Sequence, residues 1–109
     1  MNESEAEVEV DLTMVTMTFD ATDIEAMMAV LSKYVVVSRQ QAGCRNIDVG
    51  ASTTVPGRFF VVQKWDSASA QQAHFDSEPM VEMAQSCQGL LSKAPVIDLV
   101  EPISVHDLN

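Results

Sequence analysis

The stretch RFFVVQKWDSASAQQAHFDSEPM, residues 58–80, decides the fold of this chain. Its first eight residues, 58–65, are rich in valine and aromatic side chains and predict a strand that ends at the only tryptophan. Asp66 or Ser67 then caps a short helix, because a short polar side chain accepts a hydrogen bond from an otherwise unpaired backbone N–H. Pro79 begins a further helix, where its missing N–H costs little. The stretch therefore predicts a strand followed by a helical region in two pieces.

Three further strands and one long helix surround this stretch. Residues 8–19, 44–52 and 96–105 are rich in β-branched residues and predict strands, and a Pro-Gly turn joins 44–52 to 58–65 as a hairpin. With the long helix after the first strand, the order is β-α-β-β-α-β, which is the order of the ferredoxin-like fold. We therefore expect one α+β domain over residues 8–105, in which a four-stranded antiparallel sheet carries its helices on one face.

The segment 23–42 is predicted to form the long helix. Thr22 and Glu25 have the spacing of a capping box, in which each side chain bonds a backbone N–H at the start of the helix. Five apolar residues follow at the spacing of one helical face: Ile24, Met27, Met28, Leu31 and Val35. Gly43 stands where a left-handed residue would end the helix.

Composition and charge limit the partners of this protein. The chain has 109 residues, and six Lys and Arg against sixteen Asp and Glu give a formal net charge of -10. Such a surface repels nucleic acids and anionic lipids, so neither is an expected partner. No apolar run approaches the roughly 20 residues of a transmembrane helix, and the acidic N-terminus does not resemble a secretory signal. We expect a cytoplasmic protein with reduced cysteines, an acidic disordered tail over residues 1–7 and a C-terminal tail over 106–109.

The strand 58–65 does not alternate between apolar and polar residues, as a half-exposed antiparallel strand should. Its apolar side chains point to both sides of the sheet: Phe59 and Val61 to one face, Phe60 and Val62 to the other. Helices cover only one face, and a large exposed apolar patch is rare on a soluble monomer. We therefore expect a homodimer that packs sheet to sheet about a two-fold axis, with Trp65 and Met17 near the seam.

The residue pattern of this region resembles the antibiotic biosynthesis monooxygenase family. The positions that match the family signature are Gln63, Trp65, Asp66, Ser67, Ala73, His74, Ser77 and Met80, preceded by the pair Gly43 and Cys44. The resemblance covers roughly residues 8–105. It implies that two ferredoxin-like sheets form a dimeric α+β barrel, and it implies a cofactor-independent monooxygenase.

The chain departs from the family pattern in two places. Many relatives have a second histidine after the proline, where this chain has Met80 after Pro79. The haem-degrading branch has an asparagine on its first strand, a tryptophan at the position of His74 and a histidine near Met83, and this sequence has none of them. The resemblance therefore argues against haem as a substrate.

Five residues are candidates for a catalytic or binding site. His74 is the candidate base, since an unperturbed imidazole titrates near pH 6.5, although it can equally well be a structural residue bonded to the backbone. Trp65 is either the wall of a substrate pocket or a core residue. Met14 and Met83 suit an adaptable apolar cavity, as they suit ordinary core filling. Asn46 offers a hydrogen bond to a ligand or to water. No cluster of metal ligands and no glycine-rich fingerprint appears, so no metal and no redox cofactor is expected.

Three functions remain open from the sequence. The first is a homodimeric monooxygenase that oxidises a quinol, an anthrone or a similar small electron-rich aromatic with O2, with His74 as base. The second is a non-catalytic module that binds a small apolar ligand, and the third is a cofactor-free isomerase, because one fold hosts several activities.

Overall fold

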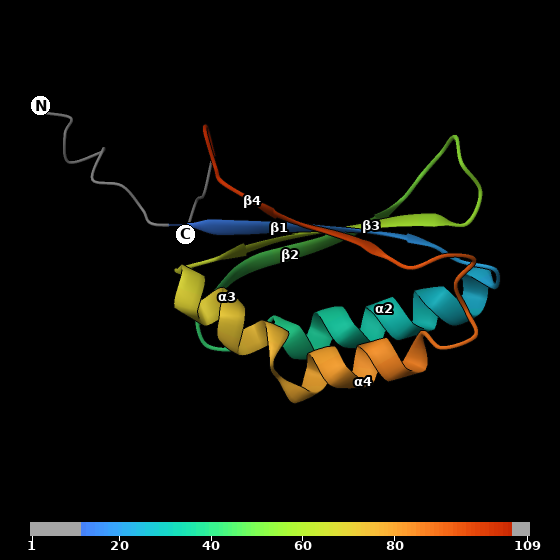
Figure 1. Cartoon of the computed structure of the whole chain (residues 1–109), viewed down its shortest axis with the longest axis horizontal. Coiled ribbons are helices and arrows are strands. Elements are labelled where there is room, and N and C mark those ends of the chain that lie inside the picture. The colour runs from blue at the N-terminus through green and yellow to red at the C-terminus, as the bar shows by residue number, and fades with distance from the viewer. Residues whose placement is uncertain (1–11, 106–109) are drawn as a thin grey trace, which may run out of the picture.

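The computed structural model describes residues 12–105 and has the expected β-α-β-β-α-β order, with the second helical region in two pieces (Figure 1). The elements are β1 (Thr13–Asp20), α2 (Ile24–Ser38), β2 (Cys44–Ala51), β3 (Arg58–Trp65), α3 (Ala68–Phe75), α4 (Glu78–Ser86) and β4 (Val96–Val100). The predicted tails, 1–7 and 106–109, and the predicted strand residues 8–11 lie outside the described residues.

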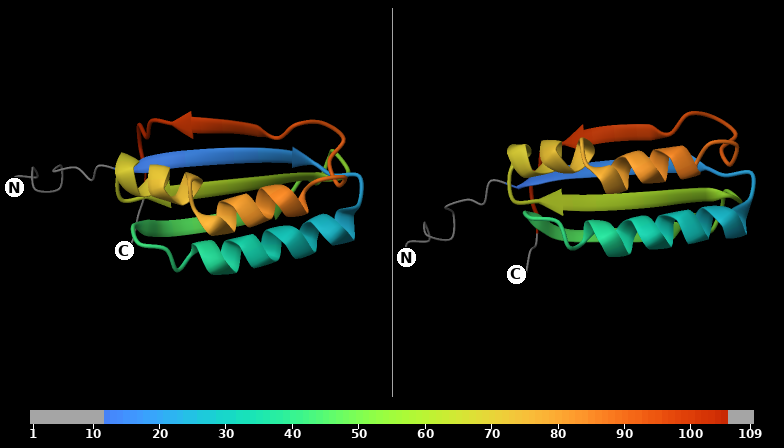
Figure 2. Two further views of the ribbon diagram at one scale, coloured as in Figure 1. Left: turned by 60° about the horizontal axis from the view of Figure 1, so that its bottom comes forward. Right: turned by 90° about the horizontal axis from the view of Figure 1, so that it is seen from below.

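The four strands form one antiparallel sheet in the order β2-β3-β1-β4. All three helices lie on one face of it (Figure 1). Seen from the helix side, α3 and α4 run along the half of the sheet that contains β4, and α2 runs along the half that contains β2 (Figure 2). No helix in the described part of the chain is long and apolar enough to cross a membrane.

The limits of α2 differ from the prediction. Its N-cap is Asp23, whose carboxylate accepts a hydrogen bond from the N–H of Ala26 at 3.1 Å, while the hydroxyl of Thr22 donates to the carbonyl of Leu90 instead. The helix ends at Ser38, four residues before the predicted end. Beyond it the backbone N–H groups bond carbonyls three residues back, which tightens the last turn and ends the helix.

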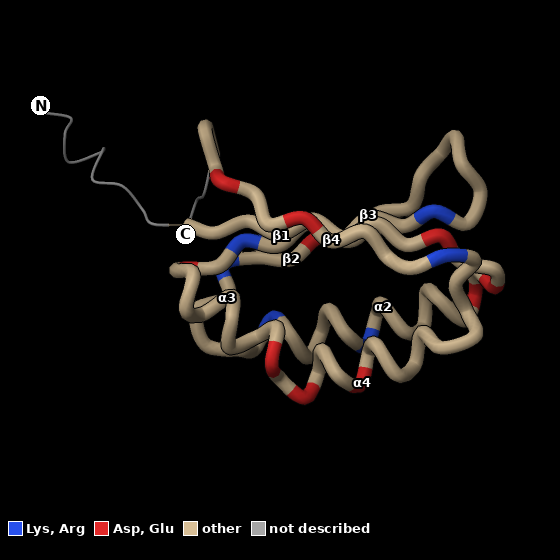
Figure 3. Tube along the Cα trace, viewed as in Figure 1, with Lys and Arg blue, Asp and Glu red and all other residues tan. Residues whose placement is uncertain are grey.

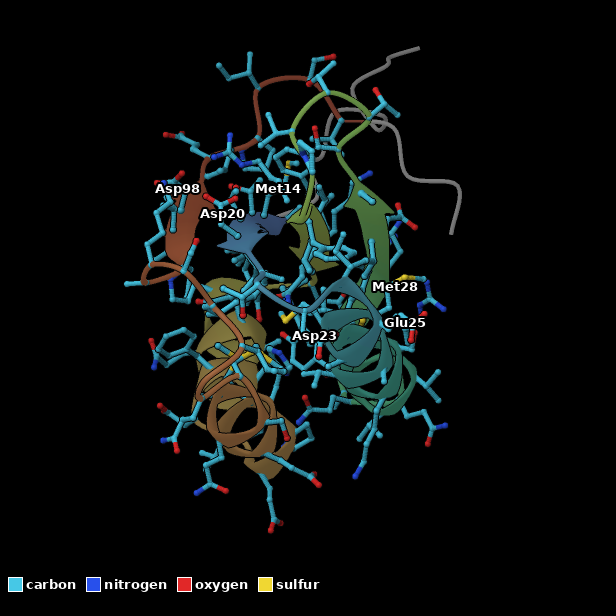
Figure 4. All side chains as sticks on the ribbon, turned by 90° about the vertical axis from the view of Figure 1, so that its right-hand side faces the viewer. Met14, Asp20, Asp23, Glu25, Met28 and Asp98 are labelled. Atoms are coloured by element: carbon cyan, nitrogen blue, oxygen red, sulfur yellow. The ribbon has the colours of Figure 1, made fainter. Side chains whose placement is uncertain are left out.

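The apolar face of α2 also differs in part. Met27, Leu31 and Val35 are buried as expected, but Ile24 and Met28 are exposed, and Met28 lies on the flank of the helix beside β2 (Figure 4). The buried face instead includes Tyr34 and Ser38. The buried face of α2 therefore includes two polar residues, which the spacing of its apolar residues did not predict.

The hairpin is confirmed closely, whereas the last strand is shorter than predicted. β3 has the predicted limits, 58–65, and β2 ends one residue early, at Ala51. β4 ends at Val100 rather than at residue 105. Val100 pairs with Met14 near the start of β1, and Pro102 has no N–H to continue the ladder.

The core lies between the sheet and the helices. Its largest members come from β1, β3 and α2: Met17, Phe19, Trp65, Met27 and Leu31. Trp65 and Met17 are both fully buried on the helix side, so the prediction that they lie near a seam on the other face is wrong. In β1 the odd positions from Val15 to Phe19 are the larger and more apolar set, and these turn inward.

The other face of the sheet, named here the open face, carries both apolar and polar side chains. Thr18 of β1 pairs with Phe60 of β3 and with Val96 of β4, and Thr16 pairs with Val62 and Asp98. Phe60 and Val96 are largely exposed there. The apolar residues of β3 do point to both faces, as predicted, but the threonines of β1 make the open face less apolar than expected.

Candidate functional site

Five side chains form a buried chain of hydrogen bonds between β3 and the helices. The indole Nε1–H of Trp65 donates to Oε1 of Gln63 at 2.9 Å, and Nε2 of Gln63 donates to the hydroxyl oxygen of Tyr34 at 2.6 Å. That hydroxyl lies 2.7 Å from Nε2 of His74. The other ring nitrogen of His74, Nδ1, bonds Oε1 of Gln41 in the loop after α2. We call these five residues the polar network.

The directions of the hydrogen bonds in the polar network follow from two groups, the indole N–H of Trp65 and the amide oxygen of Gln41. An indole N–H only donates, so Oε1 of Gln63 accepts and its amide nitrogen must donate to Tyr34. The amide oxygen of Gln41 only accepts, so Nδ1 of His74 carries a hydrogen and donates to it. In the neutral ring Nε2 is then the acceptor of the hydroxyl hydrogen of Tyr34.

The environment of the network keeps both of its titratable groups uncharged. Burial lowers the pKa of His74 from 6.5 to about 4, and the ring is only 1% exposed. Burial raises the pKa of Tyr34 to about 12, against the smaller opposite effect of its hydrogen bond from Gln63. At neutral pH the pair is therefore a phenol bonded to a neutral imidazole.

The rings of the network also pack on one another. The imidazole of His74 stacks on the indole of Trp65 with ring centroids 4.6 Å apart, and the ring of Tyr34 lies 5.5 Å from it. The N-cap of α3, Ser67, accepts from the N–H of Ala70, and this fixes where the helix begins. His74 lies in the last turn of α3, so its position depends on that start.

A groove lies beside the network, between α3 and α4 on one side and β4 on the other. It consists of two hollows of about 320 Å³ and 280 Å³ that share Ile97. Gln71 and Phe75 of α3 line the first hollow, and Met80, Met83 and Ala84 of α4 line the second. We call it the β4 groove. It is open to solvent, since Leu99 on its β4 side is 68% exposed.

The β4 groove is largely apolar, and its described lining has no charged residue. None of the described residues that line it is Lys, Arg, Asp or Glu. α3 has no charged residue of these types along its length (Figure 3), and the one in β4, Asp98, lies on the open face (Figure 4). The chemistry of this lining suits a neutral, largely apolar small molecule.

A family model described as antibiotic biosynthesis monooxygenase matches residues 12–86 of this chain. The chain belongs to the antibiotic biosynthesis monooxygenase family. The match includes β1 through α4, and so it includes the whole polar network. No curated protein matches the sequence.

Solved structures share the monooxygenase-family fold at low sequence identity. Rv0793 from Mycobacterium tuberculosis has a TM-score of 0.78 at 19% identity, over 87% of this chain and 98% of its own. PA3566 from Pseudomonas aeruginosa has 0.76 at 23% identity, over 90% and 99%. SnoaB from Streptomyces nogalater, described as a cofactor-independent oxygenase, has 0.78 at 10% identity, over 87% and 96%. These likenesses establish the fold.

The structure brings some of the predicted site residues together and separates others. His74 and Trp65 stack within the polar network, and Met83 lines the β4 groove. Neither His74 nor Trp65 lines either hollow of that groove. Met14 and Asn46 lie on the open face, where each pairs with Lys64 of β3, and Met14 points away from the helices (Figure 4). Within one chain these two residues are therefore not part of a site with His74.

Family resemblance and spacing did not identify three residues of the site. Tyr34 was hidden among apolar residues of α2, Gln41 lies in the turn after that helix, and Gln71 precedes His74 by one helical turn. Tyr34 is the only tyrosine of the chain, and a lone phenol on a buried helical face needs a partner. This was the one feature of the sequence that could have indicated a buried hydrogen bond at Tyr34.

The described residues contain no group of three or more His, Cys, Asp or Glu side chains placed to hold a metal ion. Cys44 and Cys87 are free thiols, and burial raises the pKa of both. Cys87 lines the β4 groove beside Met83, with its Sγ 3.6 Å from the Met83 sulfur. A protonated thiol is a weak nucleophile, so Cys87 contributes to the apolar wall.

Proposed function

We propose that this protein is a cofactor-independent monooxygenase that oxidises a small, neutral, electron-rich aromatic, of the quinol or anthrone type, with O2. The observation that carries the proposal is the uncharged β4 groove, which α3 lines through Gln71 and Phe75, together with the neutral Tyr34–His74 pair whose imidazole is on the same helix. Membership of the monooxygenase family and the fold shared with a cofactor-independent oxygenase support it.

The reaction asks little of the protein beyond binding and proton transfer. An anthrone loses a proton from its CH2 carbon, and the resulting enolate reduces O2. The CH2 carbon becomes a carbonyl, and the second oxygen atom leaves as water. The pocket excludes water from the enolate, and a base accepts the first proton.

In this proposal His74 is the proton acceptor and acts through Tyr34. Its Nε2 lies 2.7 Å from the hydroxyl oxygen of Tyr34, so in this proposal that hydroxyl passes its hydrogen to the imidazole while it takes one from the substrate. Because no residue of the polar network lines the β4 groove, this step requires the substrate to reach Tyr34 from the groove. Met83 shapes the groove. Trp65 supports the imidazole by stacking rather than by touching the substrate.

A second candidate function is binding without turnover. It is favoured by the fact that both ring nitrogens of His74 already have partners, and that the ring is buried. The polar network would have the same hydrogen bonds if it only stabilised the walls of the groove and took no part in a reaction. The same β4 groove would then hold a neutral ligand that the protein stores or senses.

The proposal includes a cytoplasmic homodimer that packs through the open face. The exposed Phe60 of β3 and Val96 of β4, which lie on either side of Thr18 of β1, are the apolar residues that a second copy would cover. Two free cysteines are consistent with a reducing compartment.

Oxygen uptake tests the monooxygenase directly. Purified protein without added flavin, metal or haem is offered a panel of hydroquinones and anthrones, alongside three variants. Saturable uptake should fall roughly 100-fold or more in His74→Gln, as for a lost base, and should also fall in Tyr34→Phe. Gln85→Met, on the outside of α4, should keep the wild-type rate. No uptake above the uncatalysed rate for any substrate would rule against turnover in favour of the binding module, whose ligands would raise the melting temperature.

A further inference from the structure

One side chain of the β4 groove is polar, buried and without a partner. Gln71 of α3 is only 6% exposed and lines the hollow between α3 and β4. Its backbone N–H bonds the carbonyl of Ser67 as part of the helix, but its side-chain amide makes no hydrogen bond to any residue among 12–105. The amide atoms are not among the fully buried unpaired atoms of the described residues, so what exposure Gln71 has is in part at its amide, on the hollow that it lines.

The amides around Gln71 do not share this property. Gln63 and Gln41 belong to the polar network, where each bonds at least one described side chain. Gln72, the next residue, is exposed and donates to Asp76 at 3.2 Å. Gln71 is thus a buried glutamine that lines the groove and whose side-chain amide bonds no other described residue.

We propose that Gln71 is the specificity-determining residue of the β4 groove, where its amide hydrogen-bonds one oxygen of a neutral bicyclic or tricyclic aromatic ligand. The inference rests on the groove of the proposed function, whether or not the ligand is turned over. The amide has both a donor and an acceptor, so it accepts a hydrogen from a phenol or donates one to a ketone. The opposite wall, Ile97 and Leu99, offers only apolar contacts.

The same lining excludes charged ligands. No cation is present among the residues that line the groove, and the whole chain carries a formal net charge of -10. A carboxylate placed there would lose its hydration without gaining an ion pair. The ligand class is therefore a neutral aromatic that carries a hydroxyl or carbonyl oxygen.

Binding measurements with matched probes test this role. The probes are 1-naphthol, 1-tetralone, naphthalene and 1-naphthoate, titrated by calorimetry or NMR into wild type, Gln71→Met and the control Gln85→Met. Methionine keeps the length of the side chain and removes the amide. Ala84→Phe, which fills the second hollow, reports whether the probes occupy the groove.

In wild type, 1-naphthol and 1-tetralone should bind roughly 3- to 10-fold more tightly than naphthalene, the value of one hydrogen bond. Gln71→Met should abolish that preference, leave naphthalene binding unchanged and not lower the melting temperature of the free protein. 1-Naphthoate should bind worst. Gln85→Met should behave as wild type, and Ala84→Phe should weaken binding of all three neutral probes.

Any of three results would overturn the inference. One is a preference for oxygen-bearing probes that persists in Gln71→Met, and another is the absence of binding by any neutral probe. The third is a Gln71→Met protein that is several degrees less stable with unchanged affinities, since that is the signature of a structural amide. Oxygen uptake decides the proposed function separately: a Gln71-dependent preference without uptake keeps this inference and rejects the monooxygenase.

Discussion

The hydroxyl of Tyr34 lies 2.7 Å from Nε2 of His74, so the only tyrosine of the chain donates to a neutral imidazole. This contact joins α2 to α3 across the core. The hydroxyl of Tyr34 can donate to His74 only while Nε2 is unprotonated, because a protonated His74 would present a second N–H donor to the phenol oxygen, beside that of Gln63. The stability of the fold and the chemistry of the site therefore depend on the same hydrogen bond.

The first prediction concerns acid. His74 has a pKa of about 4 in the folded state and an ordinary value near 6.5 when unfolded. The stability that the neutral ring contributes is therefore fully present above pH 6.5 and is lost as the pH falls toward 4. Between pH 7.5 and 5.0 the free energy of unfolding should drop by about 2 kcal/mol from this group. Urea unfolding at the two pH values measures it.

A matched pair of variants isolates the effect of His74. His74→Gln should be less stable at pH 7.5 but should lack the drop of about 2 kcal/mol assigned to this ring. His106→Gln, which removes the other histidine of the sequence, should keep that drop. Equal pH dependence in wild type and His74→Gln would mean that the imidazole is accessible to protons in the folded state.

The second prediction uses Tyr34 as its own probe. Its pKa is raised by burial to about 12 in the folded state, above the unfolded value of about 10, so the neutral phenol contributes stability that is lost as the pH rises through that range. Absorbance at the phenolate band should show ionisation of only a few per cent at pH 10.5 in folded protein, and of about three-quarters in urea. Because the chain has one tyrosine, the signal has one source. A folded-state midpoint near 10 would contradict a buried Tyr34–His74 pair.

The fold was predictable because its signals are local and consistent. The strand 58–65 and the two helices after it were predicted from β-branched residues, Ser67 and Pro79, and each of these acts within a few residues. The limits of α2 were harder, because Thr22 and Asp23 are both good caps. The choice between them depends on Leu90, which is 68 residues away and takes the hydroxyl of Thr22.

The site was less predictable because it depends on which way each strand faces. Cys44 pairs with Trp65 on the helix side, but the register shifts before Asn46, so Asn46 pairs with Lys64 and faces away. Such a bulge reverses the faces of the residues beyond it, and alternation alone does not reveal it. Met14 faces away from His74 for a similar reason, since the core uses the odd residues of β1.

The third prediction tests the homodimer through two equally exposed valines. Val96 on the open face is 47% exposed, and Val81 on α4 is 49% exposed. A second copy that covers the open face would bury Val96, so Val96→Asp should shift a dimer toward monomer in sedimentation equilibrium, with a dissociation constant raised 10-fold or more by a buried, unpaired charge. Val81→Asp should leave the assembly unchanged. A wild-type monomer at micromolar concentration, or equal effects of both variants, would reject an interface on the open face.

The fourth prediction concerns the loop that carries the chain from Gln41 into β2. Gly43 there has φ +84°, and a Cβ added to it would lie 2.5 Å from the Cβ of Ala70 in α3. Gly43→Ala should therefore destabilise the protein by roughly 2–4 kcal/mol, from left-handed strain and from displacement of α3. Gly50→Ala is the control, because its Cβ would meet no atom within 4 Å and its φ is not in the left-handed region. Urea unfolding should show little change for it, or a slight gain.

A double variant separates the two causes of that loss. Ala70→Gly removes the atom that the new Cβ would strike, so in the background of Gly43→Ala it should recover part of the stability, although glycine within α3 costs about 1 kcal/mol on its own. The coupling energy from the four proteins should be favourable and on the order of 1 kcal/mol or more. Because α3 carries His74, Gly43→Ala should also make Tyr34 ionise at lower pH than in wild type, whereas Gly50→Ala should not. Additive effects of the two changes would show that Gly43 is required only for its backbone conformation and not for the close approach of α3.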